Sequence, residues 1–244
     1  MVDAEDIKKL EHLTKQIESS TGWKIEKGNR NLMISHYIFM SNYKKLKNSL
    51  ELFNRKEVSS KIWAIKNRDK LNQFQIEIIC LFHNYLASVK SLVDHTRIMV
   101  HEVYGDNDFS KEYNLKIKDV FANSSLARFV QDLRNYILHK GIPVMLAQMK
   151  FKESEETNSI LLDLSSLRSW DGWKAKSREY LNNAKDHINL YEIIGAYESL
   201  VINFFDWFQK RQNELYSEEF EKTQKIKDEH NKIVLKILPP LPDE

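Results

Sequence analysis

The residues of this chain whose types and spacing could do chemistry lie between Asp132 and Val144, in the stretch DLRNYILHKGIPV. Arg134, Asn135 and His139 all fall within it. A histidine imidazole exchanges protons near neutral pH, and an arginine guanidinium holds phosphate or carboxylate oxygens with a planar fork of N–H donors. Residues of these types at one place suit proton transfer beside an anionic group, provided that the surrounding elements present them to a ligand.

The stretch closes an amphipathic helix that we expect to begin with Ser124 or Ser125 as its N-cap and to run to His139 or Lys140. Gly141 and the proline two positions later then stop the helix. On a helical wheel of about 100° per residue, the apolar side chains fall within roughly 120° of arc and form a stripe that faces the core. They are Leu126, Phe129, Val130, Leu133, Tyr136 and Ile137.

Four other side chains of this helix project away from the stripe. Measured from Leu126, Arg134 lies at about 80°, Leu138 at about 120°, Asn135 at about 180° and His139 at about 220°. An outward polar face is ordinary, but an outward leucine among polar residues favours a surface that meets a partner subunit or a ligand. The alternative interpretation is a solvated helix face with a favourable cation at the helix C-terminus.

The composition predicts a mainly α protein whose recognition of phosphate must be local. Only 6 Gly and 4 Pro leave few obligatory turns, and 42% hydrophobic residues suffice for a sizeable core. Lys plus Arg number 37 against 35 Asp plus Glu, which gives a formal charge of +2. A net charge this small provides no general attraction to nucleic acid, so a phosphate-binding site would need its own local cations.

Cysteine usage and hydropathy bear on metal sites and on location. Cys80 is the single cysteine, which excludes an intramolecular disulfide and a Cys-pair zinc site. His83, His101 and His187 have no carboxylate or cysteine neighbours at ligand spacing, so we expect neither a metal nor a cofactor. The acidic start and the lack of a run of about 18 uncharged apolar residues predict a soluble, cytoplasmic protein without a membrane segment.

Hydrophobic periodicity predicts how the chain is organised. We expect helices over about 4–20, 35–53, 70–103, 124–140, 174–181 and 189–216, the last continuing as a solvated extension. The segment 22–34 lacks a clear period and is expected to be a loop, and two apolar segments around the charged turn KESEET predict a hairpin at about 144–165. The prediction is a helical core (70–216), an N-terminal helical extension packed on it (1–69) and a C-terminal helical extension with a proline-rich tail (217–244).

The residues RNYILH, from Arg134 to His139, resemble the R-x4-6-H signature of the HEPN superfamily, in which a polar residue commonly follows the arginine. The order of a long central helix, the motif helix and a long closing helix is similar too. The resemblance covers about residues 70–216 and implies a helical bundle, here with a small hairpin insertion, that pairs as a homodimer so that two copies of the motif face each other. It also implies metal-independent endoribonuclease activity in a toxin or antiphage defence effector, with RNA as substrate and a neutralising antitoxin or other defence partner.

Under that resemblance each residue of the motif has a role. His139 would move the proton of the ribose 2'-hydroxyl or of the leaving 5'-oxygen, and Arg134 would bind the phosphoryl oxygens as charge develops. Asn135 would orient the phosphate or the ribose, and Lys140 would add charge for the nucleic-acid backbone. The alternative, from a different functional class, is a non-catalytic helical module that uses the same surface for protein partners or for passive RNA binding.

Two further features compete with or extend this site. The segment RNLMISH, Arg30 to His36, fits the same spacing, but it lies in the segment without a clear period, so we favour the copy at Arg134. On the central helix, polar residues at spacings of three and four form a narrow strip that could face the motif helix and complete a substrate groove. They are Asn84, Ser88, Ser91 and His95. The alternative for this strip is a partly solvated seam or close helix packing over the small serines.

Overall fold

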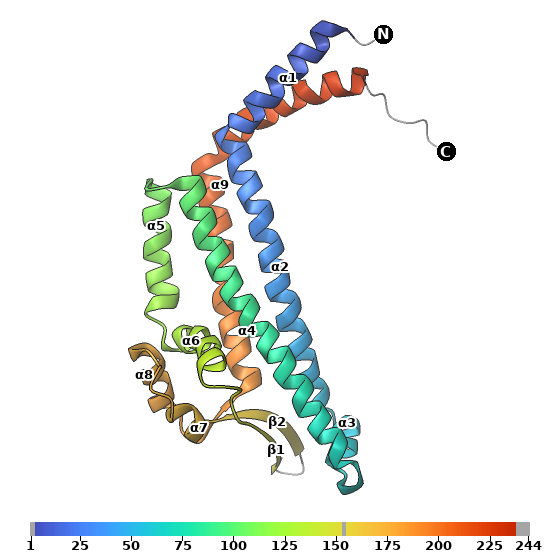
Figure 1. Cartoon of the computed structure of the whole chain (residues 1–244), viewed down its shortest axis with the longest axis vertical. Helices are drawn as coiled ribbons and strands as arrows, with labels where there is room; N and C mark the ends of the chain where they lie inside the picture. Colours follow the sequence, from blue (N-terminus) through green and yellow to red (C-terminus); the bar gives the residue numbers. More distant parts are fainter. Residues whose placement is uncertain (1–2, 153–154, 238–244) are drawn as a thin grey trace, which may run out of the picture.

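A computed structural model describes residues 3–152 and 155–237 of the chain, and it is mainly α with a small antiparallel sheet (Figure 1). The helices are α1 Ala4–Ser19, α2 Thr21–Phe53, α3 Lys56–Trp63, α4 Arg68–Tyr104, α5 Asp108–Ile117, α6 Ser125–His139, α7 Leu164–Arg168, α8 Ala175–Asn183 and α9 Leu190–Ile237. Short turns of 3-10 helix (η1, Ile65–Asn67) and π-helix (η2, Lys118–Ala122) precede α4 and α6. The strands are β1 Met145–Lys152, β2 Glu155–Asp163 and β3 His187–Asn189, in the order β1-β2-β3.

The core lies where the three long helices α2, α4 and α9 run side by side (Figure 1). Each contributes one fully buried ring to a common aromatic cluster: Phe39 lies 5.8 Å from Tyr85 and 6.3 Å from Tyr197 between ring centroids. Burying an aromatic side chain contributes about 1.5–3 kcal/mol of transfer free energy. Helix α2, which lies within the predicted N-terminal extension (1–69), is therefore one of the three core helices.

The prediction of a loop over residues 22–34 is wrong, since α2 is continuous from Thr21. Gly22, near the start of this helix, serves close packing: a Cβ on Gly22 would come within 2.4 Å of the Thr223 hydroxyl and 2.6 Å of the Glu219 carbonyl. Only glycine permits α9 to pass α2 at this distance. Ser20, as N-cap of α2, accepts a hydrogen bond from the Trp23 amide at 3.3 Å.

The two ends of the described chain leave the bundle together. Helix α9 is kinked at Tyr216, whose φ of −123° and ψ of 16° are not helical, and α1 packs along the part of α9 beyond the kink (Figure 1). Ion pairs of Lys227 with Glu26 and of Lys236 with Asp6 join this part of α9 to α2 and α1. Helix α9 continues beyond the kink to Ile237, over part of the predicted C-terminal extension, whereas the proline-rich tail lies outside the described residues.

The predicted hairpin is confirmed. Strand β1 pairs with β2 in a register that sets Met145 opposite Leu162, and the short strand β3 pairs with the other edge of β2, with Ile188 opposite Leu162. Ile160 and Leu162 bury one face of β2 against the helices, while β1 remains an edge strand. The third strand was not predicted, because three residues are too short a segment to show an alternating pattern.

One segment of the described chain, Ile65–Tyr104, is long and apolar enough to cross a membrane, with a mean hydropathy of 1.3 over its most apolar window. This is weak evidence, because core helices of soluble proteins pass the same test, and α4 is a core helix here. The cytoplasmic location stays a prediction.

Candidate functional site

Helix α6 forms as its sequence predicts. The Ser124 hydroxyl caps it by accepting a hydrogen bond from the Ala127 amide at 3.1 Å. At the other end, the amides of Lys140 and Gly141 both donate to the Tyr136 carbonyl, at 2.8 Å and 3.1 Å. Gly141 has a φ of +134°, a conformation that suits glycine, and it turns the chain out of the helix toward β1. The helix therefore stays regular through His139.

The buried side of α6 is held against α8 and the segment before it. The Tyr136 ring packs against Trp170 and Trp173, at centroid distances of 5.4 Å and 5.5 Å. The buried Asp132 carboxylate accepts a hydrogen bond of 2.7 Å from the buried Ser177 hydroxyl on α8. A buried carboxylate without such a donor is costly, so this bond fixes how α6 is rotated. That rotation decides which residues of the motif reach solvent.

The motif side chains lie along the last two turns of α6, and His139 lies only about 20° around the helix axis from Asp132, two turns further along. Arg134 and Asn135 are half-buried, whereas His139 and Lys140 are exposed. Among the described residues, none of these four side chains makes an ion pair or a side-chain hydrogen bond with the chain. Because the helix does not unwind before His139, Arg134 and His139 remain about 140° apart around its axis. One chain therefore presents both groups to solvent without bringing them together.

Exposed apolar side chains occur in the last turn of α6 and in the segment that follows it. Leu138 is 55% exposed, Ile142 59%, Val144 49% and Leu146 37%. They run from the last turn of α6 into the edge strand β1, and we refer to these four residues as the α6–β1 patch. Clustered exposed apolar residues next to unengaged polar groups are typical of an interaction surface.

The polar strip predicted on α4 does not join this site as a unit. Asn84 and Ser91 are exposed, but Ser88 is buried and its hydroxyl donates to the Tyr85 carbonyl of its own helix at 2.7 Å. His95 Nδ1 shares a hydrogen bond of 2.6 Å with the Ser35 hydroxyl on α2. The His95 end of the strip thus faces α2 rather than α6, and the strip resembles the packing seam that was its alternative interpretation.

The second copy of the motif, Arg30 to His36, lies within the helix α2 and not in a loop. His36 is half-buried, with its ring 4.8 Å from that of Phe205, and burial lowers the pKa of its imidazole. Its Nε2 atom is buried without a hydrogen-bond partner in the described chain. Arg30 lines a hollow beside Trp23, whereas His36 lines a different one beside Phe205. The two residues of this copy do not share a surface.

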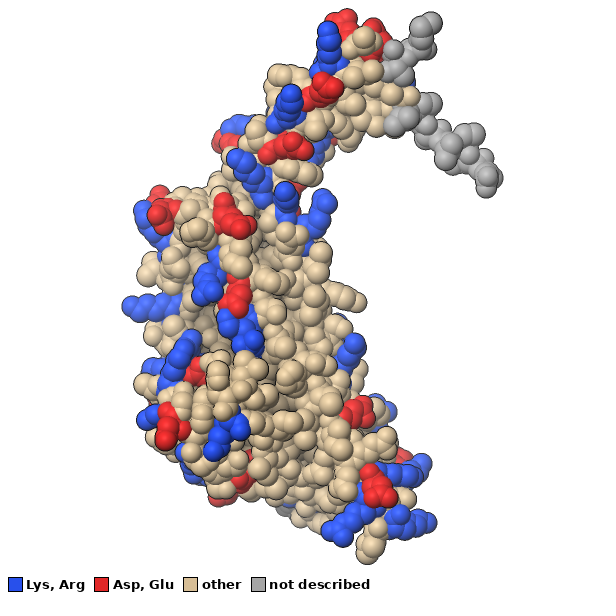
Figure 2. Space-filling view, viewed as in Figure 1, with Lys and Arg blue, Asp and Glu red and all other residues tan. Residues whose placement is uncertain are grey.

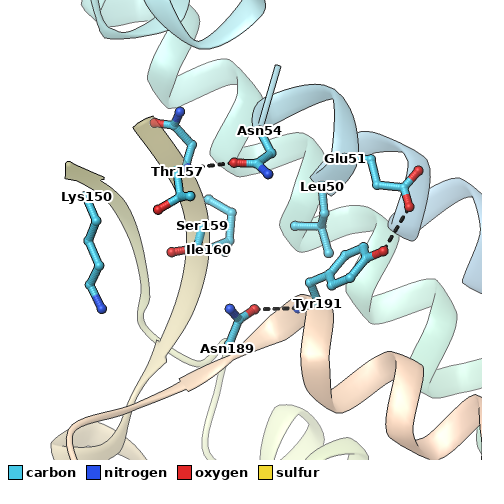
Figure 3. A pocket seen from close by; sticks show the side chains of 10 residues that line it. Leu50, Glu51, Asn54, Lys150, Thr157, Ser159, Ile160, Asn189 and Tyr191 are labelled. Atoms are coloured by element: carbon cyan, nitrogen blue, oxygen red, sulfur yellow. Dashed lines mark hydrogen bonds between the residues drawn. The ribbon is translucent and has the colours of Figure 1, made fainter. Parts of the chain in front are cut away.

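Sequence reasoning missed a polar pocket of about 430 Å³ between α2, the sheet and the start of α9 (Figure 3). The Tyr191 hydroxyl donates to the Glu51 carboxylate at 2.9 Å, which raises the pKa of the tyrosine, and the Asn54 side chain accepts from the Asn158 amide at 2.8 Å. The lining residues come from segments far apart in the sequence, so no local motif could have revealed it. None of them belongs to α6.

Charge is unevenly spread over the face shown in Figure 2. Basic and acidic side chains crowd the two ends and the margin formed by α5 and α8, whereas the middle, over α2 and α4, is largely uncharged. Within the part of the chain that the structure describes, no group of three or more His, Cys, Asp and Glu side chains could hold a metal ion. No family model, curated protein or solved structure matches this chain.

Proposed function

We propose that this protein is a homodimeric, metal-independent endoribonuclease in which Arg134 and His139 from two protomers meet at a shared site. The biological role that suits such an activity is that of a toxin or antiphage defence effector in the cytoplasm, restrained by a partner protein. The proposal rests on the resemblance of the motif to the HEPN signature together with the surroundings of α6.

The observation that carries the proposal is that Arg134 and His139 are both reachable from solvent and unengaged within the described chain, at the end of a rigidly anchored helix. A cation and an imidazole kept for structural reasons commonly pair with a carboxylate or a carbonyl. Here the contacts that anchor the helix are made by Asp132 and Tyr136. The side chains of the motif are thus free to bind a ligand.

A dimer would bring together an arginine and a histidine of the motif, which a single chain holds apart. Since Arg134 and His139 point about 140° apart, one phosphate cannot meet both side chains of the same helix end. A two-fold axis next to the α6–β1 patch would bring Arg134 of one protomer toward His139 of the other, and it would bury the exposed apolar residues. The edge strand β1 offers unpaired backbone groups to the same interface.

The chemistry needs no metal. The ribose 2'-hydroxyl attacks the adjacent phosphorus and the bond to the leaving 5'-oxygen breaks, which yields a 2',3'-cyclic phosphate and a 5'-hydroxyl. His139 removes the proton of the nucleophile or delivers one to the leaving oxygen. Arg134 neutralises the phosphoryl oxygens through a bidentate contact, Asn135 orients the phosphate or ribose, and Lys140 contacts a neighbouring phosphate.

The proposal is tested by incubating the purified protein with total RNA in excess chelator, beside His139→Ala and Arg134→Ala. His12→Ala is the matched control, because His12 is also exposed but lies far away on α1. We expect the wild type and the control to produce 2',3'-cyclic phosphate ends, and the other two variants to be inactive although folded. Retained cleavage in His139→Ala would contradict the assignment.

The second candidate is a non-catalytic module that uses the same surface to bind RNA or a protein. The uncharged patch of Leu138, Ile142, Val144 and Leu146 favours it, because such a surface also suits a protein partner. Saturable binding of RNA that Arg134→Ala weakens, with no cleavage by the wild type under any condition, would favour this function over the nuclease.

A further inference from the structure

A cavity of about 200 Å³ lies between α4, α5, α6 and α9, and the motif residues Arg134 and His139 do not line it. Aromatic rings form much of its wall. Tyr113 of α5 lies 6.1 Å from Phe204 of α9, and Phe121 of the π-helical turn η2 lies 5.5 Å from the same ring. A concave, mostly apolar space with a few polar groups is the usual form of a small-molecule site, and π-helical turns are frequent at functional sites.

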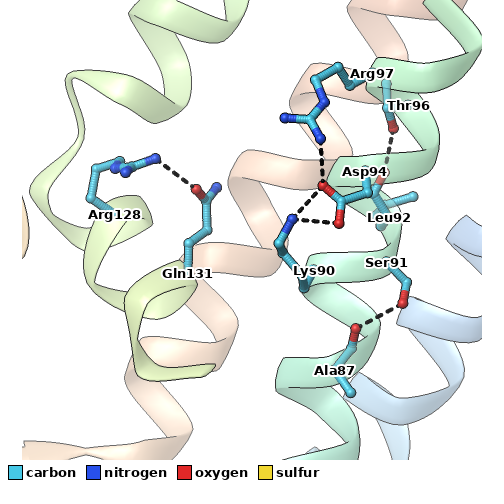
Figure 4. A network of polar contacts seen from close by, with 9 residues as sticks. All are labelled: Ala87, Lys90, Ser91, Leu92, Asp94, Thr96, Arg97, Arg128 and Gln131. Atoms are coloured by element: carbon cyan, nitrogen blue, oxygen red, sulfur yellow. Dashed lines mark hydrogen bonds and ion pairs between the residues drawn. The ribbon is translucent and has the colours of Figure 1, made fainter. Parts of the chain in front are cut away.

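Two guanidinium groups line the same cavity, and Figure 4 shows them on facing helices. On α4, Arg97 donates to Asp94 at 3.2 Å, and this carboxylate is also paired with Lys90. On α6, Arg128 donates to the neutral side chain of Gln131 at 3.2 Å. In the described chain no carboxylate lies within ion-pair distance of Arg128, although this arginine is half-buried. Its charge is therefore available to an anion from outside.

No carboxylate is among the described residues that line the cavity, so the interior does not repel an anion. Burial raises the pKa of the Tyr113 and Tyr197 hydroxyls to about 12, so both phenols are neutral at physiological pH. The charge of Arg97 lowers the pKa of Tyr113, and the charge of Arg128 lowers the pKa of Tyr197, because each guanidinium lies close to the ring concerned. The cavity thus combines an apolar, aromatic interior with a net positive rim.

We propose that this cavity binds a small organic anion whose apolar body has the size of one aromatic ring and whose carboxylate or phosphate pairs with Arg128. The size follows from the volume, since a water molecule takes about 30 Å³ of liquid and the space accommodates several heavy atoms. The ring packs against the aromatic wall, and the guanidinium supplies a charge-assisted hydrogen bond to the acidic group. This inference is independent of the proposed nuclease function.

The test uses the full chain with 3-phenylpropionate as probe and the uncharged 3-phenylpropanamide as its matched partner, measured by titration calorimetry and ligand-observed NMR. We expect saturable binding of the acid in the millimolar range or tighter, and binding of the amide at least about tenfold weaker. No saturable binding of the acid, or equal affinity for acid and amide, would overturn the proposal.

Three variants locate the site. Arg128→Gln is expected to weaken the binding of 3-phenylpropionate about tenfold, because a charged hydrogen-bond donor is lost. Val93→Phe fills the cavity and is expected to abolish binding, whereas Arg68→Gln, an exposed arginine at the start of α4, should bind like the wild type. Unchanged affinity in both Arg128→Gln and Val93→Phe would place the probe elsewhere and overturn the proposal. If either variant does not fold, the comparison of acid with amide on the wild-type protein still decides.

Discussion

The chain carries an arginine followed by a histidine at similar spacing twice, and the histidines of the two copies have opposite surroundings. In α2, His36 lies mid-helix against Phe205 with a buried ring nitrogen, and Arg30 lines a separate hollow. In α6, His139 ends the helix in solvent and Arg134 has no partner in the described chain. The spacing of an arginine and a histidine is therefore not sufficient to form a binding site. The position of each copy relative to the helix end and to the core decides which side chains a ligand can reach.

The largest effect that separates the two copies concerns activity. His139→Ala is expected to reduce RNA cleavage at least about 100-fold, because general acid and base catalysis usually contributes that much. His36→Ala is expected to retain cleavage within a few-fold, since His36 lies mid-helix in α2 with its ring packed against Phe205. Rates on a defined RNA in chelator measure both, and the opposite pattern of losses would transfer the site to α2.

The next effect concerns assembly. Leu138→Asp places a charge in the α6–β1 patch and is expected to turn the dimer into a monomer that no longer cleaves RNA. Tyr37→Asp is the matched variant on α2, where Tyr37 is 73% exposed, and it should leave the dimer intact. Sedimentation or light scattering reports the mass. A dimer that only Tyr37→Asp dissociates would place the interface on α2.

A smaller effect concerns the anchoring of α6. Ser177→Ala removes the hydroxyl that donates to the buried Asp132 carboxylate and is expected to lower the free energy of unfolding by about 1–3 kcal/mol. Ser199→Ala removes an exposed hydroxyl of α9 and should change stability by less than about 0.5 kcal/mol. Urea denaturation measures both. Equal stabilities would mean that another contact orients α6.

The smallest effect concerns pH. Burial lowers the pKa of His36 in the folded protein, with Asp206 acting in the opposite direction, so near pH 6 the unfolded chain binds more protons at this position. The contribution of neutral His36 to stability is therefore present above its ordinary pKa of about 6.5 and is lost as pH falls through the lowered value. The difference in Tm between wild type and His36→Gln should shift slightly against the wild type between pH 7.5 and 5.5. A shift in its favour would contradict the burial of this ring.

Much of the fold was predictable from the sequence because the signals were local. The serine N-cap and the Gly141 stop gave the bounds of α6, and alternating apolar residues around a charged turn gave the hairpin. The beginning of α2 was missed because residues 22–34 show no clear apolar period, and the packing of α9 against Gly22 involves residues far away in the sequence. The exposure of His139 followed from the helical wheel. The aromatic cavity beside Arg128 could not be predicted, because five separate elements close it.

The most direct test of the central claim mixes two inactive variants. If Arg134 of one protomer acts with His139 of the other, an exchanged mixture of Arg134→Ala and His139→Ala contains dimers with one intact site. After random exchange about half of the dimers contain one chain of each variant, and each of these mixed dimers has one intact site out of two. Cleavage should therefore recover to about one quarter of the wild-type rate. Mixed dimers that form, as shown by differently tagged chains, but stay inactive would contradict a site shared between protomers.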